Sequence, residues 1–214
     1  ILDQVPNVWN GTAWADDNRT FFYLTADSAK RGNTVWKHEV GRPHAQDEKI
    51  FEEENILFTV GLSRSKSGRY VFIASEGFTS SEVRVIPAAD PAAEPRVLAP
   101  RRDQIEYTAD HVPGLFLLCT NEDAVNFRIL AAPEEGASAG RWGEWLPHRK
   151  EVFVEGIEAF RDHVVVIERA EGLRRLRVQE LGGGGAHYIT FPEPAYAILM
   201  GTNADFESET VRFG

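Results

Sequence analysis

The residues Ser63-Arg64-Ser65-Lys66 match the Ser-x-x-Lys motif of acylating serine enzymes. In those enzymes the serine is the nucleophile, it lies at the start of a helix, and partner motifs occur elsewhere in the sequence. Here the motif falls on a polar turn between two expected strands, and the partner motifs are missing from the sequence. A Gly-x-Ser-x-Gly nucleophile elbow is missing too. We therefore expect no catalytic serine in this chain.

Three consecutive glutamates, Glu52, Glu53 and Glu54, form the densest acidic cluster of the sequence. Paired carboxylates are the catalytic groups of most glycoside hydrolases. However, adjacent residues on a strand point to opposite faces of the sheet, so these three side chains cannot converge on one substrate atom. We expect them to form a solvated sheet edge.

The histidines and the cysteine lack the spacing of a metal site. The six histidines are at positions 38, 44, 111, 148, 163 and 187, with no His-x-x-x-His pair and no cysteine pair nearby. We expect each histidine to be either buried and satisfied by the backbone, or exposed on a loop. Cys119 lies in an apolar run, which indicates a small buried side chain.

Two further features suggest ligand binding but have simpler explanations. The run 182–185 consists of four glycines, yet it lacks the Lys-Ser/Thr ending and the following helix of a phosphate-binding loop, so we expect a flexible connection between strands. Trp36, Trp142 and Trp145 are expected to pack between sheets instead of stacking on a ligand. The sequence thus predicts no catalytic, metal-binding or cofactor-binding residue, and no cofactor.

Short apolar runs recur along the chain at a nearly constant spacing, at 21–24, 70–73, 115–118 and 164–167. Each follows a polar turn and precedes a third strand pattern, at 34–40, 82–86, 127–131 and 173–178, and a fourth, at 48–52, 96–99, 142–146 and 187–191. Four strands that repeat with a period of about 47 residues are typical of β-propeller blades. The sequence therefore predicts an all-β fold, a β-propeller segment with about four complete four-stranded blades and part of a fifth.

The predicted blades cover 8–54, 55–103, 104–150 and 151–193, with a partial blade at 194–214 that opens with a strand at 196–200. Residues 1–6 have the pattern of the last strand of a preceding blade. We expect an excerpt of a longer protein, because the chain begins at Ile1 and stops inside a new blade. Two architectures remain open: part of a larger ring of about seven blades, or a ring of about five that closes by pairing its termini and so protects its strand edges.

Composition limits the possible partners and the compartment. The formal net charge is −10 and the basic residues are scattered, which argues against nucleic acid or anionic lipid as a partner. No apolar run reaches the length that spans a membrane. With Cys119 as the only cysteine, this chain has no internal disulfide, and a reducing, cytoplasmic compartment is expected.

Several short segments of the sequence occur in the same order as similar segments in one known protein family. They are 14–18 with Phe22-Tyr23, 65–70 with 79–84, 102–111 with Thr120-Asn121 and Asn126-Phe127, and Glu168-Arg169 with Gly172-Leu173. Together they resemble the propeller domain of oligopeptidase B, also called protease II, of the prolyl oligopeptidase family. The resemblance spans almost the whole chain. Asn55 departs from it, since an aspartate is expected after the glutamates, and this puts any acidic role of that position in doubt.

The resemblance implies a seven-bladed propeller that caps an α/β-hydrolase domain, in which a Ser-Asp-His triad cleaves short peptides after Arg or Lys. The triad would belong to the other domain, so no catalytic residue can be placed on this chain. The propeller would enclose the active-site cavity, exclude large folded proteins and move relative to the catalytic domain. We expect this chain alone to be inactive, with the hydrolase domain of the same protein and short basic peptides as its partners.

Two other functions remain open. One is a self-contained propeller that binds a protein or a carbohydrate. The other is an autonomous propeller glycosidase, which needs two carboxylates facing each other across a central pocket. No spacing in the sequence singles out such a pair.

Overall fold

The computed structural model describes residues 3–137 and 141–214. Within these ranges the chain forms sixteen β-strands in four antiparallel sheets of four strands each, and one turn of 3₁₀-helix at His44–Gln46. Among the described residues, no helix is long and apolar enough to cross a membrane. The chain divides into two compact units, Ile1–Glu106 and Tyr107–Gly214.

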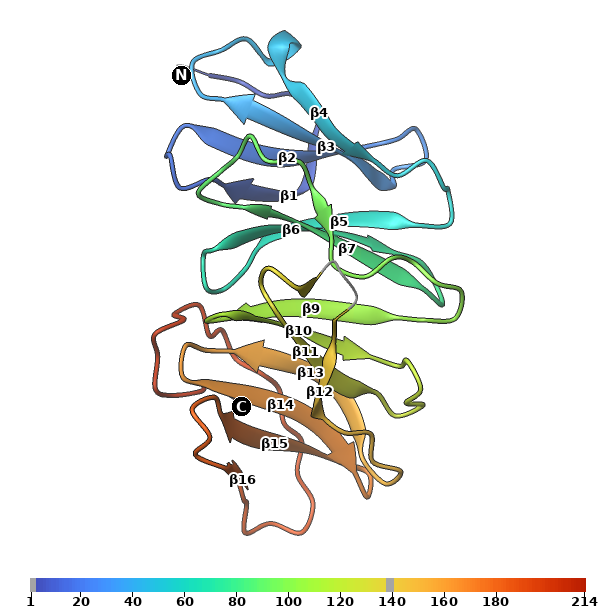
Figure 1. Ribbon diagram of the computed structural model, residues 1–214, viewed down its shortest axis with the longest axis vertical. Helices are drawn as coiled ribbons and strands as arrows, with labels where there is room; N and C mark the ends of the chain where they lie inside the picture. Colours follow the sequence, from blue (N-terminus) through green and yellow to red (C-terminus); the bar gives the residue numbers. More distant parts are fainter. Residues whose placement is uncertain (1–2, 138–140) are drawn as a thin grey trace. The chain divides into compact units, whose positions relative to one another are not determined.

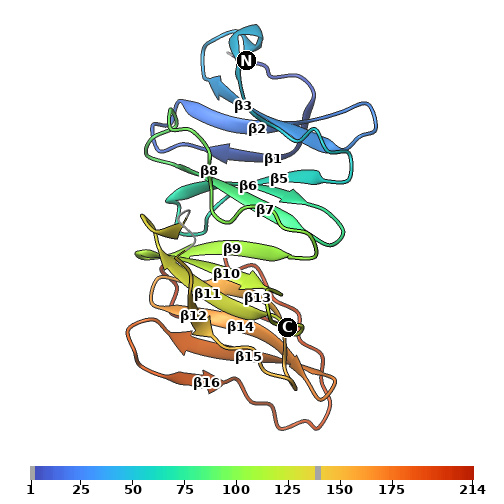
Figure 2. The ribbon, with the colours of Figure 1, turned by 45° about the vertical axis from the view of Figure 1, so that its right-hand side comes forward.

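The first unit contains two sheets in which strands adjacent in sequence pair with each other (Figures 1 and 2). The first sheet consists of β1 (Val8–Trp14), β2 (Thr20–Ala26), β3 (Gly32–Glu39) and β4 (Glu48–Glu52). The second consists of β5 (Thr59–Arg64), β6 (Tyr70–Glu76), β7 (Ser81–Pro87) and β8 (Arg96–Val97). This up-and-down order of four strands is the order of a propeller blade.

The core of the first unit lies between these two sheets. Phe22, Leu24 and Val35 of the first sheet pack against Val71 and Ile73 of the second, and all five are buried. Because side chains alternate along a strand, Tyr23 and Trp36 point to the other face of the first sheet. That second face carries the candidate functional site.

The second unit repeats this organisation. Its third sheet consists of β9 (Tyr107–Val112), β10 (Leu115–Thr120), β11 (Arg128–Pro133) and β12 (Gly143–Leu146). The fourth consists of β13 (Phe153–Ala159), β14 (His163–Ala170), β15 (Leu173–Glu180) and β16 (Ala186–Tyr188). Leu117 and Ile129 of the third sheet pack against Val164 and Val166 of the fourth.

The last segment of the chain covers the other face of the fourth sheet. Val165 and Leu176 of that sheet form a buried cluster with Ile198, and Tyr196 and Phe213 pack against it. These contacts explain why β14 is apolar on both faces, as expected for an inner strand covered from two sides.

Turn chemistry sets the strand pairing. At the β14–β15 turn, Glu171 and Gly172 both have positive φ, 51° and 81°, as a two-residue hairpin turn of type I′ requires. At the β1–β2 turn, the Asp17 carboxylate accepts hydrogen bonds from the backbone N–H groups of Arg19 and Thr20 at 2.9 and 2.8 Å. Both turns keep the register that buries the apolar face of each hairpin.

The predicted all-β fold class is confirmed, and the fourth-strand prediction at 48–52 matches β4. The predicted fourth strands at 96–99 and 187–191 are shorter in the structure, at Arg96–Val97 and Ala186–Tyr188. The strand expected at 196–200 is wrong: only an isolated bridge between Met200 and Phe213 forms there. Residues 3–6 form no strand, and positions 1 and 2 of that predicted strand lie outside the described residues.

Candidate functional site

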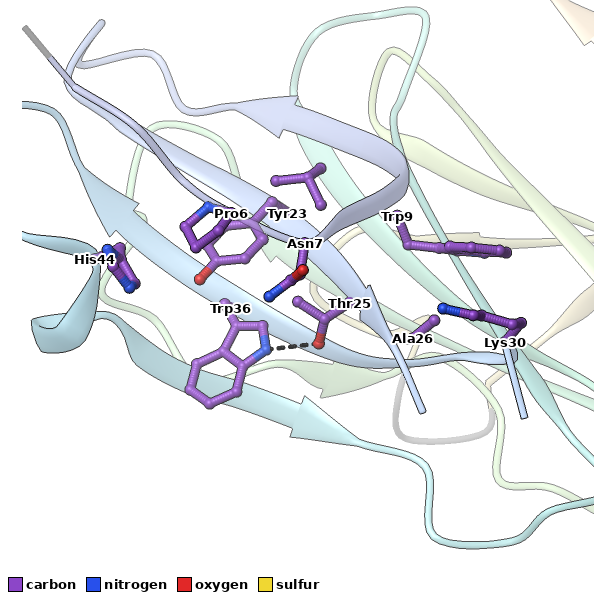
Figure 3. Close-up of a pocket in the computed structure, with 10 residues that line it drawn as sticks. Pro6, Asn7, Trp9, Tyr23, Thr25, Ala26, Lys30, Trp36 and His44 are labelled. Atoms are coloured by element: carbon purple, nitrogen blue, oxygen red, sulfur yellow. Dashed lines mark hydrogen bonds between the residues drawn. The ribbon is translucent and has the colours of Figure 1, made fainter. Parts of the chain in front are cut away.

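An aromatic pocket of about 530 Å³ lies on the face of the first sheet that points away from β5–β8. Three aromatic side chains from three successive strands contribute to its wall: Trp9 from β1, Tyr23 from β2 and Trp36 from β3 (Figure 3). The full lining is Pro6, Asn7, Val8, Trp9, Tyr23, Thr25, Ala26, Lys30, Trp36 and His44. These ten residues include a lysine and a histidine but no carboxylate.

Hydrogen bonds hold two of the aromatic walls in place. The indole N–H of Trp36 donates to Thr25 Oγ1 at 3.0 Å, a bond across the β2–β3 pair that Figure 3 shows. The hydroxyl of Tyr23 donates to Asp47 Oδ2 at 2.8 Å. Burial raises the pKa of Tyr23 far above its ordinary value, and the hydrogen bond to Asp47 and the charge of Asp47 act in the same direction. Two of the three aromatic side chains of the pocket, Tyr23 and Trp36, are therefore held in fixed positions.

His38 lies beside this pocket and is fully buried. Its Nδ1 is 2.7 Å from Asp47 Oδ1, and its Nε2 is 3.0 Å from Asp3 Oδ2. Asp3 Oδ2 also accepts the backbone N–H of Gly41 at 2.6 Å. The imidazole thus joins the segment before β1, strand β3 and the β3–β4 loop.

The two carboxylates control the protonation of the ring. Burial by itself would lower the pKa of His38, but the hydrogen bonds to Asp3 and Asp47 and the charges of both carboxylates outweigh it, so the pKa is raised above 6.5. The pKa of Asp3 is lowered, mainly by the hydrogen bond from the Gly41 backbone and then by the one from His38. Because both ring nitrogens face carboxylates and no ring atom is exposed, His38 is not available as a base for an external substrate.

Sequence reasoning missed this cluster. It expected a buried histidine to be satisfied by the backbone, whereas His38 is satisfied by Asp3 and Asp47. His111 is also buried, and its Nε2 lies 3.1 Å from Glu134 Oε1. In the sequence, Asp3 is 35 positions and Asp47 is 9 positions from His38, and Glu134 is 23 positions from His111. No short-range spacing could indicate them.

The Ser-x-x-Lys pattern lies at the end of β5 and on the β5–β6 turn. Ser65 is buried, and its Oγ lies 2.9 Å from Ser67 Oγ and accepts the Tyr70 backbone N–H at 3.0 Å. These contacts explain Ser65 as a residue that shapes the hairpin turn. That no serine of this chain acts as a nucleophile stays a prediction.

Of the three glutamates, Glu52 ends β4 and Glu53 and Glu54 follow it, and the expectation of a solvated edge is wrong for Glu53. Glu53 is only 6% exposed. Its carboxylate pairs with Arg101 and accepts the Asn55 backbone N–H at 3.1 Å. Burial acts to raise the pKa of Glu53, but the hydrogen bonds and the charge of Arg101 outweigh it, and the pKa is lowered. Glu52 is exposed and pairs with Lys49 on the surface.

The remaining candidate residues take structural positions. Cys119 is 3% exposed, and burial raises its pKa to about 12. Trp145 packs against the cluster between the third and fourth sheets, as predicted, whereas Trp36 lines the pocket. The glycines at 182–185 connect β15 and β16. Within the described residues, no group of three His, Cys, Asp or Glu side chains is arranged to hold a metal ion.

Comparison with known proteins identifies the family. A family model described as "Prolyl oligopeptidase, N-terminal beta-propeller domain" matches residues 1–214. Dipeptidyl aminopeptidase BI from Pseudoxanthomonas mexicana is 38% identical over 100% of this chain, and Protease 2 from Moraxella lacunata is 30% identical over 99%. The chain spans 30% of the length of each relative.

Solved structures agree on the fold. Oligopeptidase B from Trypanosoma brucei, in its closed form with covalently bound antipain, superposes on all of this chain with a TM-score of 0.92 and 24% identity. Oligopeptidase B from Leishmania major covers 97% of it with a TM-score of 0.89 and 25% identity. The chain covers 32% and 30% of those two proteins. The chain therefore belongs to the N-terminal β-propeller domain family of the prolyl oligopeptidases.

Proposed function

We propose that this chain is the non-catalytic propeller domain of a serine peptidase, and that it limits the substrates of a separate α/β-hydrolase domain to short peptides. The observation that carries the proposal is the match of the whole chain to the peptidase propeller family. Two relatives with peptidase names are about three times longer than the chain, which leaves room for a catalytic domain. The propeller would act by steric exclusion and by shielding the reaction from water.

The names of the relatives point to two substrate classes. Protease 2 and the oligopeptidase B structures support an oligopeptidase, for which we propose cleavage after Arg or Lys. Dipeptidyl aminopeptidase BI has a name that describes release of dipeptides from an amino terminus. The net charge of −10 on this chain is compatible with attraction of basic peptides in both cases.

A peptide-length series on the full-length protein tests the filtering role. We would measure kcat/KM for Arg-containing peptides of increasing length and for a folded protein with an exposed Arg-containing loop. We expect short peptides to be cleaved and the folded protein to be cleaved at least about a hundredfold more slowly, because it cannot enter an enclosed cavity. Equal rates for the folded protein and the short peptides would contradict the proposal.

A second comparison separates the two substrate classes. The same short peptide is offered with a free amino terminus and with an acetylated one. An oligopeptidase that cleaves after Arg or Lys accepts both, whereas an enzyme that releases dipeptides from the amino terminus loses activity on the acetylated peptide. Cleavage of the acetylated peptide after Arg is the result that we expect, and cleavage of the unblocked peptide alone would overturn that specificity.

A further inference from the structure

We propose that His38 is a proton-operated clamp that holds residues 3–7 over the aromatic pocket of the first sheet. Asp3, at the start of this segment, contacts His38 and Gly41. Pro6 and Asn7, at its end, line the pocket together with Tyr23 and Trp36 (Figure 3). The segment is therefore anchored at one end by the imidazole and lies along the pocket at the other.

The geometry requires a doubly protonated ring. A neutral imidazole has one N–H and one lone pair, so one nitrogen of His38 would direct a lone pair at a carboxylate oxygen. The distances are 2.7 Å to Asp47 and 3.0 Å to Asp3, and Asp47 is held as an acceptor by the Tyr23 hydroxyl. Both contacts are favourable only when both ring nitrogens carry protons. Loss of one proton therefore breaks the contact with the more exposed partner, Asp3.

Asp3 is the partner that can leave. Its side chain is 24% exposed, whereas that of Asp47 is 3% exposed and accepts a second hydrogen bond from Tyr23. Residues 3–6 form no strand with the described residues of this chain. Among the described residues outside the segment, the Gly41 N–H is the other group that holds Asp3, and one exposed hydrogen bond does not keep the carboxylate in place once the ring becomes neutral, so this bond is lost as well.

The other charged groups around the ring are engaged elsewhere. On β3, Lys37 pairs with Glu48, and Glu39 pairs with Arg19 and Arg42. The centre of the Phe21 ring, on β2, lies 5.0 Å from the centre of the His38 ring. His44, in the β3–β4 loop, lines the pocket. His44 is thus a second histidine near the segment, and the experiment must separate its titration from that of His38.

Hydrogen exchange measured by mass spectrometry on the full-length protein tests the clamp. The backbone N–H of Gly41 donates to Asp3 Oδ2 and reports directly on the anchor. Between about pH 5.5 and 9.5, after correction for the intrinsic exchange rate, we expect its protection to fall at least about tenfold while the core amides of β6 stay protected.

Three variants identify the titrating group. His38→Gln should abolish the pH response at Gly41, and Asp47→Asn should move its midpoint to lower pH, because one of the two carboxylates that favour the imidazolium is removed. His44→Gln is the matched control and should leave the response unchanged. If His38→Gln does not fold, the direction in which Asp47→Asn moves the pH midpoint of Gly41 protection still shows whether His38 is the titrating group. The clamp is refuted if the wild-type protection does not change with pH, if Asp47→Asn leaves the midpoint in place, or if His44→Gln removes the response.

Discussion

The guanidinium carbon of Arg101 lies 3.6 Å from the centre of the Phe58 ring. Arg101 follows β8, whereas Phe58 ends the connection between β4 and β5. Arg101 also pairs with the buried carboxylate of Glu53 at the start of that connection. Arg31 donates to the backbone carbonyl of Phe58 at 2.6 Å. Two arginines, Arg31 and Arg101, thus hold the connection between β4 and β5, which joins the first sheet to the second.

Replacing Arg101 by Met should destabilise the first unit. The change leaves Glu53 buried without its cationic partner and removes the cation–π contact, which together we expect to cost about 2 to 4 kcal/mol. Urea unfolding of wild type and variant measures the loss. The double variant Glu53→Gln/Arg101→Met should recover part of it, since no buried charge then lacks a partner.

The exposed ion pair between Arg19 and Glu39 provides the control for Arg101. The side chain of Arg19 is 69% exposed, and Arg19→Met should leave the unfolding midpoint unchanged within error. An equal loss of stability in Arg19→Met and Arg101→Met would contradict the role given to the buried pair.

Gly77 is required by the position of the Phe58 ring. A Cβ at residue 77 would lie 2.7 Å from Phe58 Cε1, and the ring is held under Arg101, so it has little room to shift. We expect Gly77→Ala to lower stability by about 1 to 3 kcal/mol through overpacking. Gly156→Ala, where a Cβ meets nothing within 4 Å, is the matched control and should be neutral or slightly stabilising. A neutral Gly77→Ala in thermal unfolding would show that the ring moves freely.

Asp17 should make the stability depend on pH in the acid range. Hydrogen bonds from the backbone of Arg19 and Thr20 and from the Thr20 hydroxyl lower its pKa below 3.8. The folded state then binds this proton less readily than the unfolded state, so its stabilisation is present above pH 3.8 and lost as the pH falls through the lower folded-state pKa. Asp17→Asn should therefore be less stable than wild type at neutral pH, and the difference should shrink in strong acid.

Unfolding midpoints measured at neutral pH and at about pH 2.5 to 3 check this dependence. Asp162→Asn serves as the control, because Asp162 is 79% exposed in the β13–β14 turn. A difference between Asp17→Asn and wild type that stays constant over the whole range would contradict the assignment.

Cys119 should be inert in the folded protein. It is 3% exposed and its pKa is raised to about 12, so roughly one thiol in ten thousand is ionised at pH 8. We expect a maleimide to label the Cys119 peptide in urea but not in native buffer, as measured by peptide mass mapping. Rapid labelling of this peptide under native conditions would mean that β10 opens readily.

The sequence predicted the strands well because strand patterns are local. The apolar run at 70–73 and the polar turn before it lie within one hairpin, β5–β6, so neighbouring residues decide the structure. The prediction failed at 196–200 because the apolar residues there pack on the fourth sheet, while backbone pairing, with residues 212–214, is confined to residues 199–201. An apolar sequence pattern indicates that a segment is buried, but it does not by itself determine whether the backbone of that segment pairs as a strand.

The candidate site could not be predicted because its contacts join residues that are distant in the sequence. The same is true of Glu53, outside that site: it meets Arg101, 48 positions away, so its burial depends on how two sheets pack. His38 meets Asp3 across 35 positions, and the aromatic walls come from three strands whose faces are set by register. Glu52 and Glu53 have different partners, Lys49 and Arg101, but strand alternation gave no information on which glutamate is buried.

Labelling the full-length protein with a serine-directed fluorophosphonate, followed by mapping of the labelled peptide, tests the central claim most directly. A propeller that filters substrates for a separate catalytic domain predicts that the label lies on a serine outside residues 1–214 and that labelling abolishes peptide cleavage. A label on a serine within these residues, such as Ser63 or Ser65, would contradict it.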